Sequence, residues 1–106
     1  MSNQLESQAE QVAKESTTHR QTARCFAAAG NISEASRFFA KALAACDRGS
    51  GTEARQLRAA LLGEHSACLA RTGNFVAAYA LARQSLHENP DDKNMCVLAK
   101  TFNSNL

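Results

Sequence analysis

Few residues of this chain have types and spacings that could do chemistry. His65 and Cys68 are three residues apart, so on one helix they would share a face and could supply two metal ligands, or a nucleophile and its base. No second pair has metal-ligand spacing, and buried packing residues of these types need no reaction to explain them. The segment Gly49-Ser50-Gly51 lacks the lysine and flanking glycine of a phosphate-binding loop. We therefore expect no catalytic residue, no metal and no cofactor, and hence no enzyme.

Two arginines offer another kind of chemistry, the binding of an anion. Arg20 and Arg24 are four residues apart, which places both guanidinium groups on one face of a helix, where they could reach the same anionic group. The alternative is that both are solvated arginines on an exposed face. Which of the two holds depends on the elements that position them.

Composition and charge exclude several classes of protein. With 106 residues the chain forms one domain, and its apolar residues are mainly Ala and Leu, with 6% aromatic residues and one Pro, which favours an all-helical fold. A net charge of +2 gives no electrostatic basis for nucleic-acid binding. No apolar run is long enough to cross a membrane, and the N-terminus has no signal-peptide core, so we expect no membrane insertion. The four dispersed cysteines are expected to be reduced, buried thiols of a cytoplasmic protein: Cys25, Cys46, Cys68 and Cys96.

One pattern of small residues, apolar residues and a Gly-Asn pair occurs twice, with every matched position displaced by 43 residues. The first copy contains Ala23, Phe26, Gly30, Asn31, Ile32, Ala35, Ala42 and Leu43, and the second contains Ser66, Leu69, Gly73, Asn74, Phe75, Ala78, Ser85 and Leu86. A repeat of this length is typical of helix-turn-helix units that bury their apolar faces against one another. The pattern therefore favours binding over catalysis.

Apolar periodicity and turn residues predict five helices and no strand. The expected ranges are 2–29, 33–46, 52–72, 75–88 and 93–102, with Ser33 and Thr52 as N-caps and an unravelled tail at 103–105. Pairs of small residues predict where the two helices of each hairpin cross, namely Ala23 with Ala35 and Ser66 with Ala78. Ala42 and Ser85 are expected to receive the helix of the next repeat.

The repeated positions resemble the tetratricopeptide repeat, a helix-turn-helix unit of about 34 residues. The resemblance implies an all-α fold, a short α-solenoid of antiparallel helix hairpins. Asp47 stands where the family pattern has the proline that the second copy supplies as Pro90. The implied organisation is a single domain, 1–106, made of an N-terminal helix extension (1–15), repeat 1 (16–47), a loop and helix extension (48–58), repeat 2 (59–92) and a capping helix with its tail (93–106).

The resemblance also implies a concave groove, lined by the first helix of each hairpin, that receives a peptide or helix of a partner protein. Groove-facing positions carried over from the family include Thr17, Ala28, Gly63, Val97 and Thr101. The residues we expect to contact a partner are Arg20, Arg24, Glu64, Ala67, Arg71 and Asn94.

One sub-class of the family binds the C-terminal carboxylate of chaperone tails, and this chain departs from its pattern. Arg20 matches the first position, but Arg24 and Glu64 replace two asparagines. The positions in the closing helix, Asn94 and Leu98, are not cationic. Because a carboxylate repels a carboxylate, Glu64 argues against that ligand. The mixed groove suits a partner with both charge and apolar anchors, and the expected function is a non-catalytic adaptor.

A structural role is the alternative. Two repeats are few for this architecture, and a stripe of Leu5, Ala9, Val12 and Ser16 could pair with a second copy to form a homodimer. The chain could also be a fragment of a longer repeat scaffold. The sequence names neither the partner nor the biological process.

Overall fold

The computed structural model describes residues 2–106, and for residues 2–9 it describes the backbone alone. Over this range the chain forms five α-helices and no strand: α1 (Ser2–Ala28), α2 (Ile32–Cys46), α3 (Thr52–Arg71), α4 (Phe75–Glu88) and α5 (Lys93–Ser104). The all-α class and the number and order of the helices are as predicted. No helix in the described part of the chain is both long and apolar enough to span a membrane.

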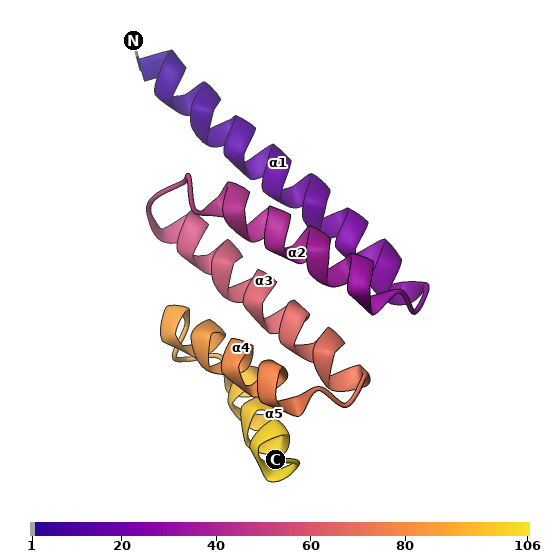
Figure 1. The fold of residues 1–106 in the computed structure, drawn as a ribbon. Helices are drawn as coiled ribbons and strands as arrows, with labels where there is room; N and C mark the ends of the chain where they lie inside the picture. Colours follow the sequence, from indigo (N-terminus) through magenta and orange to yellow (C-terminus); the bar gives the residue numbers. More distant parts are fainter. Residues whose placement is uncertain (1) are drawn as a thin grey trace.

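The helices pack in chain order as two antiparallel hairpins and a closing helix (Figure 1). α1 packs on α2 and α3 on α4, while α2 joins the two hairpins through its contact with α3 and α5 packs on α4. This arrangement is consistent with a short solenoid of helix hairpins. Two apolar clusters form the core, one around Ala23, Ala35, Phe39, Cys46 and Leu61 and the other around Ala78, Ala82, Met95, Ala99 and Phe102.

The same turn closes both hairpins. Gly30 and Gly73 have φ values of 84° and 81°, in the left-handed region that suits glycine at a helix C-terminus. The next residue, Asn31 or Asn74, caps the following helix, and its side chain accepts a hydrogen bond from a backbone N–H three residues on. The prediction that Ser33 is the N-cap is therefore wrong, because Asn31 already occupies that position, two residues earlier.

Two other helix boundaries differ from the prediction. The N-cap of α3 is Gly51 rather than Thr52, because the Gly51 carbonyl already accepts a hydrogen bond from the Arg55 N–H and Thr52 lies inside the helix. α5 continues to Ser104 instead of ending near Phe102. Its last turn is stabilised by side chains that bond back to main-chain carbonyls one turn earlier, including the Ser104 hydroxyl on Lys100.

The small residues predicted to lie at the crossing point of each hairpin are fully buried. Ala23, Ala35 and Ala78 have no exposed surface, and neither does Ser66. Side chains of this size let two helix backbones approach closely, and the larger apolar groups then pack around the contact. The pairing of Ala23 with Ala35 and of Ser66 with Ala78 is consistent with this burial.

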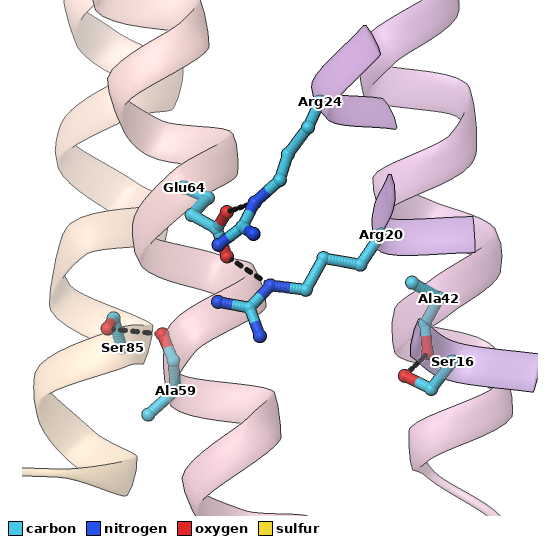
Figure 2. Close-up of polar contacts among 7 residues, drawn as sticks. All are labelled: Ser16, Arg20, Arg24, Ala42, Ala59, Glu64 and Ser85. Atoms are coloured by element: carbon cyan, nitrogen blue, oxygen red, sulfur yellow. Dashed lines mark hydrogen bonds and ion pairs between the residues drawn. The ribbon is translucent and has the colours of Figure 1, made fainter. Parts of the chain in front are cut away.

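A second crossing point carries one hydroxyl per hairpin, and Figure 2 shows both. The Ser16 hydroxyl of α1 donates to the Ala42 carbonyl of α2 at 2.9 Å. The Ser85 hydroxyl of α4 donates to the Ala59 carbonyl of α3 at 2.7 Å. Ser16 and Ala59 occupy equivalent positions in the repeat, and so do Ala42 and Ser85. The serine therefore lies on the first helix of one hairpin and on the second helix of the other. Ala42 and Ser85 thus contact the first helix of their own hairpin. Their expected contact with the following helix stays a prediction.

We therefore predict that the serine of the first hairpin can be moved from α1 to α2 with little loss of unfolding free energy. Ser16→Ala should cost about 1 kcal/mol of unfolding free energy, because it removes one buried hydrogen bond. Adding Ala42→Ser should restore most of that loss, since the second hairpin holds the same pair with the roles reversed. Urea denaturation of the single and double variants measures both values. A double variant less stable than Ser16→Ala alone would contradict the equivalence of the two crossing points.

The cysteines are less uniformly buried than predicted. All four thiols are free. Cys46 and Cys68 are buried, and desolvation raises the pKa of both thiols. Cys25 is exposed and Cys96 is half-buried, so the prediction of four buried thiols is wrong for Cys25. Cys25 directly follows Arg24, and because both residues are exposed, both lie on the solvent side of α1.

The segments outside the two repeats build a cavity of about 560 Å³. Its walls are the N-terminal half of α1, the 47–51 loop and the start of α3, and they include Val12, Gly49, Ala54 and Leu57. Val12 lines this cavity, and Ser16 bonds inside the hairpin. Of the stripe proposed for homodimerisation, Ser16 is thus buried within the chain and Val12 is half-buried at the cavity, while the side chains of Leu5 and Ala9 lie outside the described residues.

Candidate functional site

The structure joins three of the predicted site residues in one ion cluster. The Arg20 Nε lies 2.6 Å from Glu64 Oε2, and the Arg24 Nε lies 2.5 Å from Glu64 Oε1. Figure 2 shows both arginines reaching from α1 to the single carboxylate on α3. The two arginines do share an anionic group, as their spacing predicts, and in this structure that group is Glu64. We call these three residues the arginine–glutamate cluster.

The helix arrangement explains why long side chains meet here. α1 and α3 are the first helices of the two hairpins and contact each other only lightly, so extended arginines bridge the space between them. Each arginine is four residues from the other and therefore on the same face of α1. The side chains of Arg20 and Glu64 are 25% exposed and that of Arg24 is 46% exposed. The cluster is accordingly open to solvent and to a partner.

The cluster keeps hydrogen-bonding capacity and positive charge. Two guanidinium groups face one carboxylate, which leaves an excess of one positive charge. Among the residues described by the structure, each arginine bonds through its Nε alone, so the Nη groups have no protein partner there. A guanidinium group whose Nη donors have no protein partner can bind an oxyanion through two parallel hydrogen bonds.

Arg71 extends the positive surface along α3. Its Nη1 donates to the Ala27 carbonyl at 3.2 Å. Ala27 lies in the last turn of α1, where a cation is favourable, and its carbonyl also accepts a hydrogen bond from the Gly30 N–H at 3.0 Å. The remaining predicted site residues contribute no polar contact to the cluster: Ala67 is half-buried on α3, and Asn94 is exposed on α5.

Gly63, predicted to face the groove, is covered instead. It is buried, and a Cβ placed there would lie 2.8 Å from Met95 Cε of α5. Gly63 is the repeat equivalent of Arg20. In the first hairpin this position carries a long side chain that reaches α3, whereas in the second hairpin it carries none, so that Met95 of α5 can enter. The other family-derived positions, Thr17, Ala28, Val97 and Thr101, are exposed.

An aromatic cluster that sequence reasoning did not single out lies on the first hairpin. Phe38 stacks on Phe26 with ring centroids 5.5 Å apart and contacts the His19 ring at 6.1 Å. The Lys41 ammonium lies 4.7 Å from the Phe38 centroid, within the range of a cation–π contact. The sequence indicates this aromatic cluster only through the adjacent pair Phe38-Phe39. Because adjacent residues of a helix cannot both face the core, one of the two phenylalanines must pack elsewhere.

Of the pair with possible chemical roles, Cys68 lies in the core and His65 is half-buried. The His65 ring stacks on Phe39 with centroids 5.6 Å apart, and burial lowers the pKa of His65. Burial of His65 and Cys68 favours the neutral imidazole and the protonated thiol. Among the side chains that the structure describes, those of residues 10–106, no three of His, Cys, Asp or Glu come together as a metal-binding group.

Comparison of the chain with models of protein families, with curated proteins and with solved structures finds no match. A functional assignment therefore rests on the hairpin fold and on the arginine–glutamate cluster.

Proposed function

We propose that this protein is a non-catalytic adaptor of the tetratricopeptide type, which binds a peptide or helix of a partner protein on the side formed by α1, α3 and α5. The observation that carries the proposal is the arginine–glutamate cluster, which places charged side chains of two hairpins together on one solvent-open face. The duplicated Gly-Asn turns and small-residue crossings support the assignment to this repeat type.

The energetics favour a recognition role for the cluster. An ion pair at the solvent-exposed surface adds about 0–1 kcal/mol to stability, so the fold gains little from Arg24, whose side chain is 46% exposed. Arginine is enriched among the residues that dominate binding energy at protein interfaces. Val97 on α5, a groove position carried over from the family, is 63% exposed and offers an apolar contact. The surface thus suits a partner segment with both charge and an apolar side chain.

The same proposal places the protein in the cytoplasm. Its support is the dispersed arrangement of the four cysteines, which suits reduced thiols and not a disulfide framework.

Reversal of one charge in the cluster tests the proposal. Arg24→Glu should reduce capture of the partner from a lysate by about tenfold or more, the size expected for a residue at the centre of an interface. Far-UV circular dichroism and the melting temperature should stay unchanged, because Arg24 is exposed on a helix surface. Quantitative mass spectrometry of proteins retained by the wild type and by each variant measures the effect.

Arg37→Glu is the matched control. Arg37 also pairs with a glutamate, Glu34, at 3.3 Å, but it lies on α2 and its side chain is 60% exposed. Both reversals place two glutamates side by side, so they disturb local electrostatics alike. Proteins lost with Arg24→Glu and kept with Arg37→Glu are partners of the proposed groove. Equal retention by the wild type and Arg24→Glu would refute the proposal.

A further inference from the structure

Both arginines of the proposed groove already have an anionic partner within the chain. Glu64 receives the Nε groups of Arg20 and Arg24 at 2.6 and 2.5 Å. Figure 2 shows its carboxylate lying between the two side chains and α3. A partner's oxyanion that approaches these arginines must displace Glu64 or bind beside its negative charge. The ligand is therefore selected in competition with a carboxylate.

A carboxylate side chain of a partner is a poor competitor for this position. It presents the same functional group as Glu64, so exchange of one for the other forms no stronger hydrogen bonds. Glu64 is tethered to the same fold, and tethering gives it an effective concentration on the order of millimolar or above. Aspartate and glutamate of a partner thus gain little at the cluster.

A phosphoryl group differs from a carboxylate in both charge and geometry. A phosphorylated side chain carries a charge of about −1.5 to −2 at pH 7 and three strong acceptor oxygens. Three oxygens can bind two guanidinium groups at once, each through a two-pronged contact. Such a group can use the Nη donors that Glu64 leaves without a partner among the described residues.

The local charge also favours a dianion. Arg71 lies seven residues after Glu64 on the same helix, about 10 Å along its axis, and bonds to the end of α1. Three guanidinium groups and one carboxylate are therefore present along this surface. Their excess of two positive charges matches a phosphoryl dianion better than a single carboxylate.

We propose that the arginine–glutamate cluster binds a phosphorylated side chain of the partner protein, and that Glu64 is a built-in competitor that rejects partner carboxylates. The inference rests on the proposed function, whose groove it uses. It assigns Glu64 a positioning and selectivity role within that groove.

A titration with two small anions tests the selectivity directly. The probes are inorganic phosphate and acetate, added at constant ionic strength and pH 7.5 to the whole chain, with the arginine Nε–Hε signals followed by NMR. Signals of Arg20 and Arg24 are assigned from the variants Arg20→Lys and Arg24→Lys. We expect phosphate to shift both signals, with an apparent Kd about tenfold or more below the apparent Kd of acetate.

Glu64→Gln isolates the competitor. Because it removes the negative charge and keeps the side-chain size, both anions should then bind about tenfold more tightly, so that acetate gains the access to the arginines that Glu64 denies it in the wild type. Glu34→Gln, which alters the exposed pair on α2, should leave both affinities unchanged. Circular dichroism verifies that each variant is folded. An unchanged affinity for acetate in Glu64→Gln would overturn the proposed role of Glu64.

Two further outcomes would overturn the site itself. One is a phosphate response at Arg20 and Arg24 no larger than at Arg37, which would mean an adventitious ion only. The other is a wild-type response to acetate as strong as that to phosphate.

Capture experiments separate this inference from the proposed function. Treatment of the lysate with a protein phosphatase should reduce capture by the wild type about tenfold. Capture that survives phosphatase but is lost with Arg24→Glu would keep the adaptor function and refute the phosphoryl site. Capture that survives both would refute the adaptor function as well.

Discussion

Replacement of Phe39 by alanine should lower the unfolding free energy by about 3–4 kcal/mol, the range for a buried Phe→Ala change. Phe39 is 2% exposed and stacks on His65 of α3 at 5.6 Å. It therefore lies at the contact between α2 and α3, through which the two hairpins pack on each other. A small domain has about 5–15 kcal/mol of stability in total, so this single change should remove a large part of it.

The neighbouring phenylalanine supplies the control for this prediction. Phe38 is half-buried and stacks on Phe26 within the first hairpin instead of bridging to α3. Phe38→Ala should cost about 1 kcal/mol, in proportion to the smaller apolar area that it loses from contact. Urea denaturation followed by circular dichroism gives both values. Equal losses for the two variants would show that Phe39 does not hold the hairpins together.

Enlargement of Ala78 to leucine should have the second largest effect, a loss of about 3 kcal/mol. Ala78 has no exposed surface and belongs to the crossing of α3 and α4, where Ser66 is equally buried. The extra carbon atoms would have to enter the space between two closely packed backbones. We expect the helices to separate locally, with retained helical content, a lower melting temperature and a weaker contact between α3 and α4.

A second alanine of the same helix tests whether the effect comes from the crossing. Ala80 is exposed on α4, so Ala80→Leu should change stability by no more than about 0.5 kcal/mol. Thermal unfolding of both variants under identical conditions provides the comparison. Similar melting temperatures for Ala78→Leu and the wild type would mean that the crossing tolerates a large side chain.

The helices and turns were predictable because their signals are local. Gly30 and Gly73 adopt the left-handed conformation that ends each first helix, and the range of α4 is confirmed as Phe75–Glu88. The errors are also local: the cap positions at Ser33 and Thr52 were wrong. In each case a residue slightly earlier in the chain, Asn31 or Gly51, already satisfies the requirement of the helix start.

The candidate site was predictable only in part. The four-residue spacing of Arg20 and Arg24 correctly indicates one shared face, and their common anion proves to lie within the chain, at Glu64. Nothing in the local sequence of Glu64 shows that α3 lies within reach of α1. For the same reason the sequence could not show that Met95 covers Gly63.

The amino-acid sequence by itself determined the five helices, the paired turns and the close crossings within each hairpin. These features follow from backbone preferences and side-chain sizes at short spacings, which the 43-residue repeat states twice. The tertiary structure alone decided which groups meet between hairpins: Glu64 with the two arginines, Phe39 with His65, and Met95 with Gly63. The physical reason is that helical periodicity determines the direction of a side chain, whereas its partner depends on the distance and angle between helices distant in the chain.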